Sequence, residues 1–184
     1  MTAAAAPAKM RVAATPGWLL VVGILLACLT EALASTILAL GRADIIGDTA
    51  ATPDEFAGLD VGFTAFKLIG FAFAPWLLTR VDPRQVLLAA TLVMGAASAL
   101  AAAVTGLDLL VVLRAVQGLS GATLLVAGQA ILFWTWPAAR QPFLQALFAM
   151  GSVVAPATAA PLFEGWLVDQ RDWSWIFAAV VPLS

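Results

Sequence analysis

The chain has 184 residues, of which 62% are hydrophobic and 11% charged, and its formal net charge is −2. An average soluble domain is roughly 45–50% apolar and about 25% charged, so this composition excludes a soluble globular domain and indicates an integral membrane protein. The small negative charge argues against a nucleic-acid partner, and the absence of histidine with a single cysteine, Cys28, leads us to expect no metal, cofactor or disulfide.

Hydrophobic segments long enough to cross a bilayer follow one another along the chain, since a crossing needs about 20 apolar residues. Residues 1–17 are rich in alanine and proline and are expected to form a short tail. After the tail we predict five full transmembrane helices, over residues 18–40, 59–78, 86–104, 109–133 and 143–162. A sixth helix starts near Trp175 and has about half the required length. Residues 18–184 are therefore expected to form an all-α N-terminal transmembrane bundle that is incomplete at its C-terminal end.

Charged residues outside the spans separate into two sets on opposite sides of the membrane. The tail and the second and fourth connections carry Lys9, Arg11, Arg80, Arg84 and Arg140, with only Asp82 among them. The odd-numbered connections carry Asp44, Asp48, Asp54, Glu55, Asp108, Glu164, Asp169 and Asp172, beside Arg42 and Arg171. Because basic residues favour the cytoplasmic side, we expect a multi-pass protein of the cell inner membrane with a cytoplasmic N-terminus.

Ionisable side chains inside the spans are the first candidates for function, because a charge in hydrocarbon costs several kcal/mol. With a rise of about 1.5 Å per residue, Glu31 lies about 14 Å, Lys67 about 12 Å and Arg114 about 8 Å from the outer ends of their spans. Their similar depth predicts a buried charge cluster facing the bundle interior. Two alternatives stay open: Arg114 holds helices together without taking part in transport, and Lys67 extends toward the headgroups.

The fourth span has a polar face of small residues. Arg114, Gln117, Gly118 and Gly121 recur at helical spacing on this face. Small residues let a neighbouring helix approach closely, and an amide such as that of Gln117 can hydrogen-bond across the contact. We therefore expect this face to point into the bundle.

The fifth span contains two prolines after Gly151. Pro156 and Pro161 each remove a backbone hydrogen bond and should bend the helix. The bend either takes part in gating or is only a structural feature.

Short motifs stand in order along these spans. They are Leu33 with Thr36, Ile37 and Ile45 in the first span; Arg114-x-x-Gln117-Gly118-x-x-Gly121-Ala122 in the fourth; Gly151-x-x-x-Ala155-Pro156 in the fifth; and Trp173-Ser-Trp175-Ile176-Phe177 with Pro182 after it. Together they resemble the major facilitator superfamily, and most closely its drug/proton antiporter branch with fourteen spans. The resemblance covers nearly the whole chain from Trp18 onward.

The sequence also departs from the pattern of that branch. The first-helix acid of the branch falls at Ala34, while Glu31 stands three residues earlier on the same helical face. The loop motif Gly-x-Leu-x-Asp-Arg-x-Gly-Arg-Arg appears as the run from Pro75 to Arg84, which keeps Leu77, Arg80 and Arg84. In the fifth span, alanines at 155, 159 and 160 stand where the antiporter motif has glycines.

The resemblance implies part of a secondary transporter that exports small molecules or drugs in exchange for protons by alternating access. Its partners would be the lipid bilayer, a small-molecule substrate, protons and the missing C-terminal half. The pathway residues would be Glu31, Thr36, Lys67, Arg114 and Gln117. Structural motif positions would be Arg80, Arg84, Gly118, Gly121, Gly151, Pro156 and Pro161.

Two other classes of function compete with transport. The first is a truncated or non-transporting membrane scaffold whose buried charges only hold helices together. The second, an enzyme, is disfavoured because the spans and their flanks show no nucleophile with a base, no metal-ligand cluster and no phosphate-binding loop.

Overall fold

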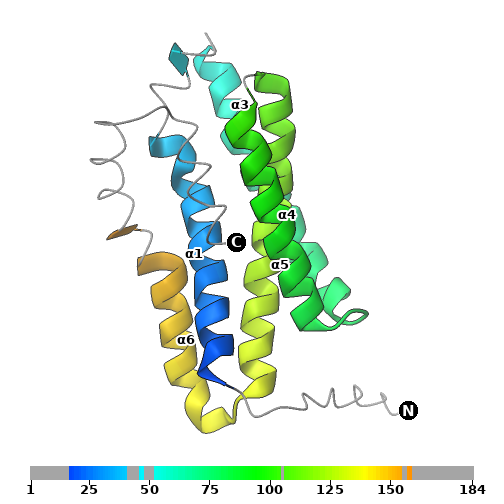
Figure 1. Ribbon diagram of the computed structural model, residues 1–184, viewed down its shortest axis with the longest axis vertical. Helices are drawn as coiled ribbons and strands as arrows, with labels where there is room; N and C mark the ends of the chain where they lie inside the picture. The colour runs from blue at the N-terminus through cyan, green and yellow to red at the C-terminus, as the bar shows by residue number, and fades with distance from the viewer. Residues whose placement is uncertain (1–16, 41–45, 48–51, 105, 155–156, 159–184) are drawn as a thin grey trace, which may run out of the picture.

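The computed structural model describes residues 17–40, 46–47, 52–104, 106–154 and 157–158, and every regular element within these ranges is helical. The elements are α1 (Trp18–Leu40), α3 (Pro53–Leu78), α4 (Pro83–Ala103), α5 (Leu107–Thr135), the 3-10 helix η1 (Ala138–Arg140), α6 (Gln141–Ala149) and the π-helix η2 (Met150–Val154), as Figure 1 shows. The predicted all-α fold is confirmed.

Four of these helices, α1, α3, α4 and α5, are long and apolar enough to cross a membrane. They correspond to the first four predicted spans. The largest shift is in α3, which begins at Pro53 rather than Leu59 because Thr52 caps it. The Thr52 amide donates to Glu55 Oε2 at 2.8 Å, and the Glu55 amide donates to Thr52 Oγ1 at 3.3 Å. This reciprocal capping box stabilises the first turn of α3 ahead of its apolar part.

The fifth predicted span is described as far as Val154, through α6 and then η2. Backbone geometry changes to a π-helix at Met150, and Ser152 Oγ donates to the Phe148 carbonyl at 2.9 Å. Single π-turns inside helices mark local departures from regular α-helical bonding. Pro156, Pro161 and the helix from Trp175 lie outside the described residues, as does nearly all of the predicted tail, so those expectations stay predictions.

Helix α5 is the central element of the bundle and contacts α1, α3, α4 and α6 (Figure 1). Glycines permit its close approach to α3. A Cβ at Gly118 would collide with the carbonyl oxygen of Phe63, and a Cβ at Gly70 would lie 2.8 Å from the carbonyl oxygen of Leu119. Small residues at such contacts are the usual basis of tight helix packing in membranes.

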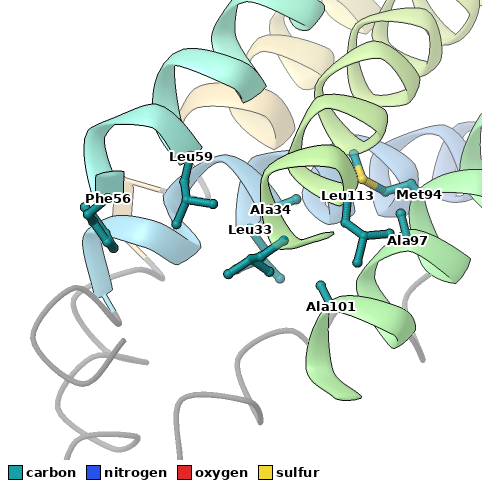
Figure 2. Close-up of a cluster of buried hydrophobic side chains, with 9 residues drawn as sticks. Leu33, Ala34, Phe56, Leu59, Met94, Ala97, Ala101 and Leu113 are labelled. Atoms are coloured by element: carbon teal, nitrogen blue, oxygen red, sulfur yellow. The ribbon is translucent and has the colours of Figure 1, made fainter. Parts of the chain in front are cut away.

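Two apolar clusters lie toward opposite ends of the bundle. We call the end where α1 and α4 finish and α3 and α5 start the distal end, and the opposite end the proximal end. The distal cluster, drawn in Figure 2, consists of Leu33, Ala34, Phe56, Leu59, Met94, Ala97, Ala101, Leu110 and Leu113. The proximal cluster consists of Val21, Ile24, Cys28, Ile131, Leu132, Trp136, Leu144 and Phe148. Glu31, Lys67, Arg114 and Gln117 lie between these clusters.

Candidate functional site

A buried ion pair links α1 to α3. Lys67 Nζ lies 2.5 Å from Glu31 Oε1, with the Glu31 side chain 4% exposed and that of Lys67 23% exposed. The ammonium group of Lys67 therefore turns toward the carboxylate rather than toward the end of the helix. The fourth-span glycine makes room for this acid, because a Cβ at Gly121 would lie 2.8 Å from Glu31 Cγ and 3.0 Å from Met94 Cε.

Arg114 lies in the same layer and is completely buried. Its Nη1 donates to the Ala34 carbonyl at 2.7 Å and to Gln117 Oε1 at 2.9 Å. Gln117 Nε2 in turn donates to Ser98 Oγ at 3.0 Å, so the chain of hydrogen bonds joins α1, α5 and α4. Within the described part of the chain, Nε and Nη2 of Arg114 have no hydrogen-bond partner.

The ring of Phe63 contacts both cations of this layer. Its centroid is 4.1 Å from Arg114 Cζ and 5.4 Å from Lys67 Nζ, both within the range of a cation–π contact. The charges of Asp60 and Glu31 also act on the Arg114 guanidinium. The layer thus contains one buried carboxylate, two cations and an aromatic ring. We refer to Glu31, Phe63, Lys67, Arg114 and Gln117 with Ser98 as the polar layer.

The polar layer places one buried carboxylate beside an ammonium group. Burial disfavours the charged form of a carboxyl group, whereas neighbouring cations favour it. The described residues contain no group of three or more His, Cys, Asp or Glu side chains that could hold a metal ion.

Other predicted site residues lie elsewhere. Thr36 Oγ1 donates to carbonyl groups of its own helix, at 3.2 Å to Ala32 and 3.1 Å to Leu33, and does not join the polar layer. Gly151 lies beside α1, where a Cβ would be 3.0 Å from Leu25 Cδ2. Pro156 and Pro161 fall outside the described residues.

The two loop arginines lie at the proximal end of α3 and α4. Arg80 stacks on Trp76, with its Cζ 4.6 Å from the ring. The backbone amide of Arg84 donates to Asp82 Oδ1 at 2.8 Å, which caps the start of α4. Neither arginine forms a salt bridge to an acid that the structure describes.

Three residues in or near the polar layer are not among the predicted site residues. Phe63 resembles any apolar residue of a span, and Ser98 resembles any small one, so neither carries a signal in the sequence alone. Asp60 does carry a signal, because it is an acid inside the predicted second span.

Comparisons with known proteins agree with this architecture. The sequence profile of the Major Facilitator Superfamily matches residues 20–184. The probable multidrug resistance protein EmrY of Escherichia coli K12 is 28% identical over 91% of this chain and 32% of its own length, and the multidrug export protein EmrB of the same strain is 26% identical over 90% and 32%. The fatty acid resistance protein FarB of Neisseria gonorrhoeae is 28% identical over 86% and 31%. The chain spans about a third of the length of these curated relatives. Because the family profile covers most of the residues, the chain belongs to the Major Facilitator Superfamily.

Proposed function

We propose that this chain is the N-terminal part of a secondary active transporter that exports small molecules in exchange for protons. The observation that carries the proposal is the Glu31–Lys67 pair, held in the bundle interior between two apolar clusters. Buried ionisable groups in membrane helices are costly and commonly mark ion or proton pathways. The matching relatives that are named as multidrug export or resistance proteins support a drug-like substrate.

Glu31 is the proposed proton carrier. In the described arrangement its Oε1 lies 2.5 Å from Lys67 Nζ. A movement of α3 relative to α1 would take Lys67 away, and the buried carboxyl group would then bind a proton. Binding and release of the proton thereby follow the relative position of two helices.

Arg114 and Gln117 are proposed to position the pathway rather than to carry the proton. Their hydrogen bonds tie α5 to α1 through Ala34 and to α4 through Ser98. In the alternating-access cycle of such folds, helical halves rock around a site near the middle of the membrane.

The remaining parts of the proposal concern the whole protein. A second helical half would complete the cavity, since this chain spans about a third of its curated relatives. We place the protein in the inner membrane with its N-terminus, and hence the proximal end, on the cytoplasmic side. Arg80, Arg84 and Gly151 are assigned structural roles at helix ends and contacts, and Thr36 a place on the pathway wall.

The test is flux through the full-length protein in proteoliposomes with an imposed pH gradient. Glu31→Gln should abolish gradient-driven flux because the amide cannot bind and release a proton. Glu55→Gln is the matched control, since Glu55 is also a carboxylate but lies exposed in the first turn of α3. Undiminished flux in the Glu31→Gln protein contradicts the proposed role.

A scaffold without transport activity is the second candidate, favoured by one observation. The hydrogen bonds of Arg114 and Gln117 join three helices and would stabilise the bundle even in a protein that moves no solute. Under this function, wild-type protein shows no flux down or against a gradient, and substitution of Arg114 lowers only its stability.

A further inference from the structure

Helix α3 carries a stripe of mainly polar residues, of which the proposed function uses only Lys67. The stripe consists of Asp60, Thr64, Lys67 and Phe71, spaced by four, three and four residues. At about 100° per residue these positions fall within an arc of about 60° on the helix. Asp60, Thr64 and Phe71 are exposed, and Lys67 is partly buried.

The stripe is unlike the rest of the exposed surface of α3. Val61 and Leu68 are each 65% exposed and Ile69 is 53% exposed, which suits contact with lipid tails. A carboxylate and a hydroxyl group on a membrane-spanning helix are costly in lipid, so such groups face protein or a water-filled cavity. The two exposed faces of α3 therefore have different surroundings in the membrane.

The stripe leads from the distal end of α3 to the proton site. Asp60 lies next to Leu59 of the distal cluster, and Lys67, about 10 Å further along the helix, is paired with Glu31. Between the helices, the distal end is occupied by the buried apolar side chains drawn in Figure 2. On the outer surface of α3 the described helices leave Asp60 and Thr64 exposed.

Asp60 is the exposed charge of the stripe. The Lys67 ammonium is already neutralised by Glu31, whereas no salt bridge to Asp60 occurs among the residues that the structure describes. An exposed carboxylate at the mouth of a low-dielectric channel raises the local concentration of cations.

We propose that Asp60, Thr64 and Lys67 line a water-filled path from the distal face to Glu31, and that Asp60 captures cations at its mouth. The captured species is a monovalent cation, either a proton or the cationic group of a solute. The role of the path in delivering cations to Glu31 rests on the proposed function of Glu31, but the contact of the path with water does not.

Cysteine accessibility tests the path in the full-length protein without measuring transport. Cys28 is buried and is first replaced by alanine. Thr64→Cys should then react at least about tenfold faster with a membrane-impermeant thiol reagent than Ala65→Cys, which lies at nearly the same depth on the lipid-facing side. Asp60→Cys and Val61→Cys form a second matched pair in case one variant does not fold.

Equal labelling within both pairs, or protection of Thr64→Cys and Asp60→Cys, overturns the path. That outcome leaves the Glu31 proposal standing, because a proton can reach Glu31 by another route. If instead Glu31→Gln leaves gradient-driven flux intact while Thr64→Cys and Asp60→Cys are labelled, the proposed function fails and the path stands. The two failures are therefore distinguishable.

The capture role of Asp60 is tested by measuring flux while the concentration of one of two cations is varied. Asp60→Asn should raise the half-saturating concentration of external protons, or that of tetraphenylphosphonium as a permanent organic cation, by about tenfold. The species whose curve shifts identifies the captured cation. Asp54→Asn, which removes an exposed acid of the first turn of α3, should shift neither. Unchanged curves for both species with Asp60→Asn refute the capture role.

Discussion

Removal of Lys67 tests how much the ion pair contributes to the stability of the bundle. Lys67→Met removes the ammonium partner of the Glu31 carboxylate, whose side chain is only 4% exposed. Removing one partner of a buried ion pair lowers the free energy of unfolding by about 3–5 kcal/mol. Because Lys67 is partly exposed and the charge of Arg114 is nearby, we expect a loss of about 3 kcal/mol here. Adding Glu31→Gln to Lys67→Met removes the unpaired charge and should restore most of the lost stability.

The assay is denaturant unfolding of the purified full-length protein in detergent, applied to wild type, both single variants and the double variant. We expect a coupling free energy of about 2 kcal/mol, in the range found for residues in direct contact. Lys67→Arg keeps a cation at this position and is the matched control. If the destabilisation of the double variant equals the sum of those of the single variants, the two side chains do not interact and the reasoning is refuted.

Two further predictions concern helix packing and capping. Gly118→Ala should lower stability by about 1–3 kcal/mol, because the new Cβ meets the backbone of Phe63, whereas Gly23→Ala meets nothing within 4 Å and should raise it by about 0.5–1 kcal/mol. Thermal unfolding in detergent measures both, and equal effects would contradict the close packing of α5 on α3. Thr52→Ala should cost about 1 kcal/mol by removing the side-chain cap that Glu55 shares, seen as faster hydrogen exchange in the first turn of α3; unchanged exchange would argue against the cap.

The fold could be predicted to a large extent from the sequence. Apolar length fixed the first four spans to within a few residues, apart from the start of α3. That start depends on the reciprocal hydrogen bonds of Thr52 and Glu55. A hydropathy pattern does not report such bonds, because the residues that form them are polar.

The candidate site was predicted by its depth but not by its pairing. The rise along a helix places Glu31, Lys67 and Arg114 at similar levels, as the structure shows by bringing Lys67 onto Glu31. Which cation faces the acid depends on the rotation of each helix about its axis, and this rotation is set by tertiary contacts such as Gly118 against Phe63. The sequence alone does not contain that information in a readable form.

The central claim, that Glu31 exchanges protons as part of transport, is tested most directly by substrate-induced proton release. The purified full-length protein in weakly buffered detergent is mixed with a transported substrate while a pH indicator is followed. The account predicts proton release from wild type and none from the Glu31→Gln variant, with substrate binding retained in both. Equal proton release from the two proteins would contradict it.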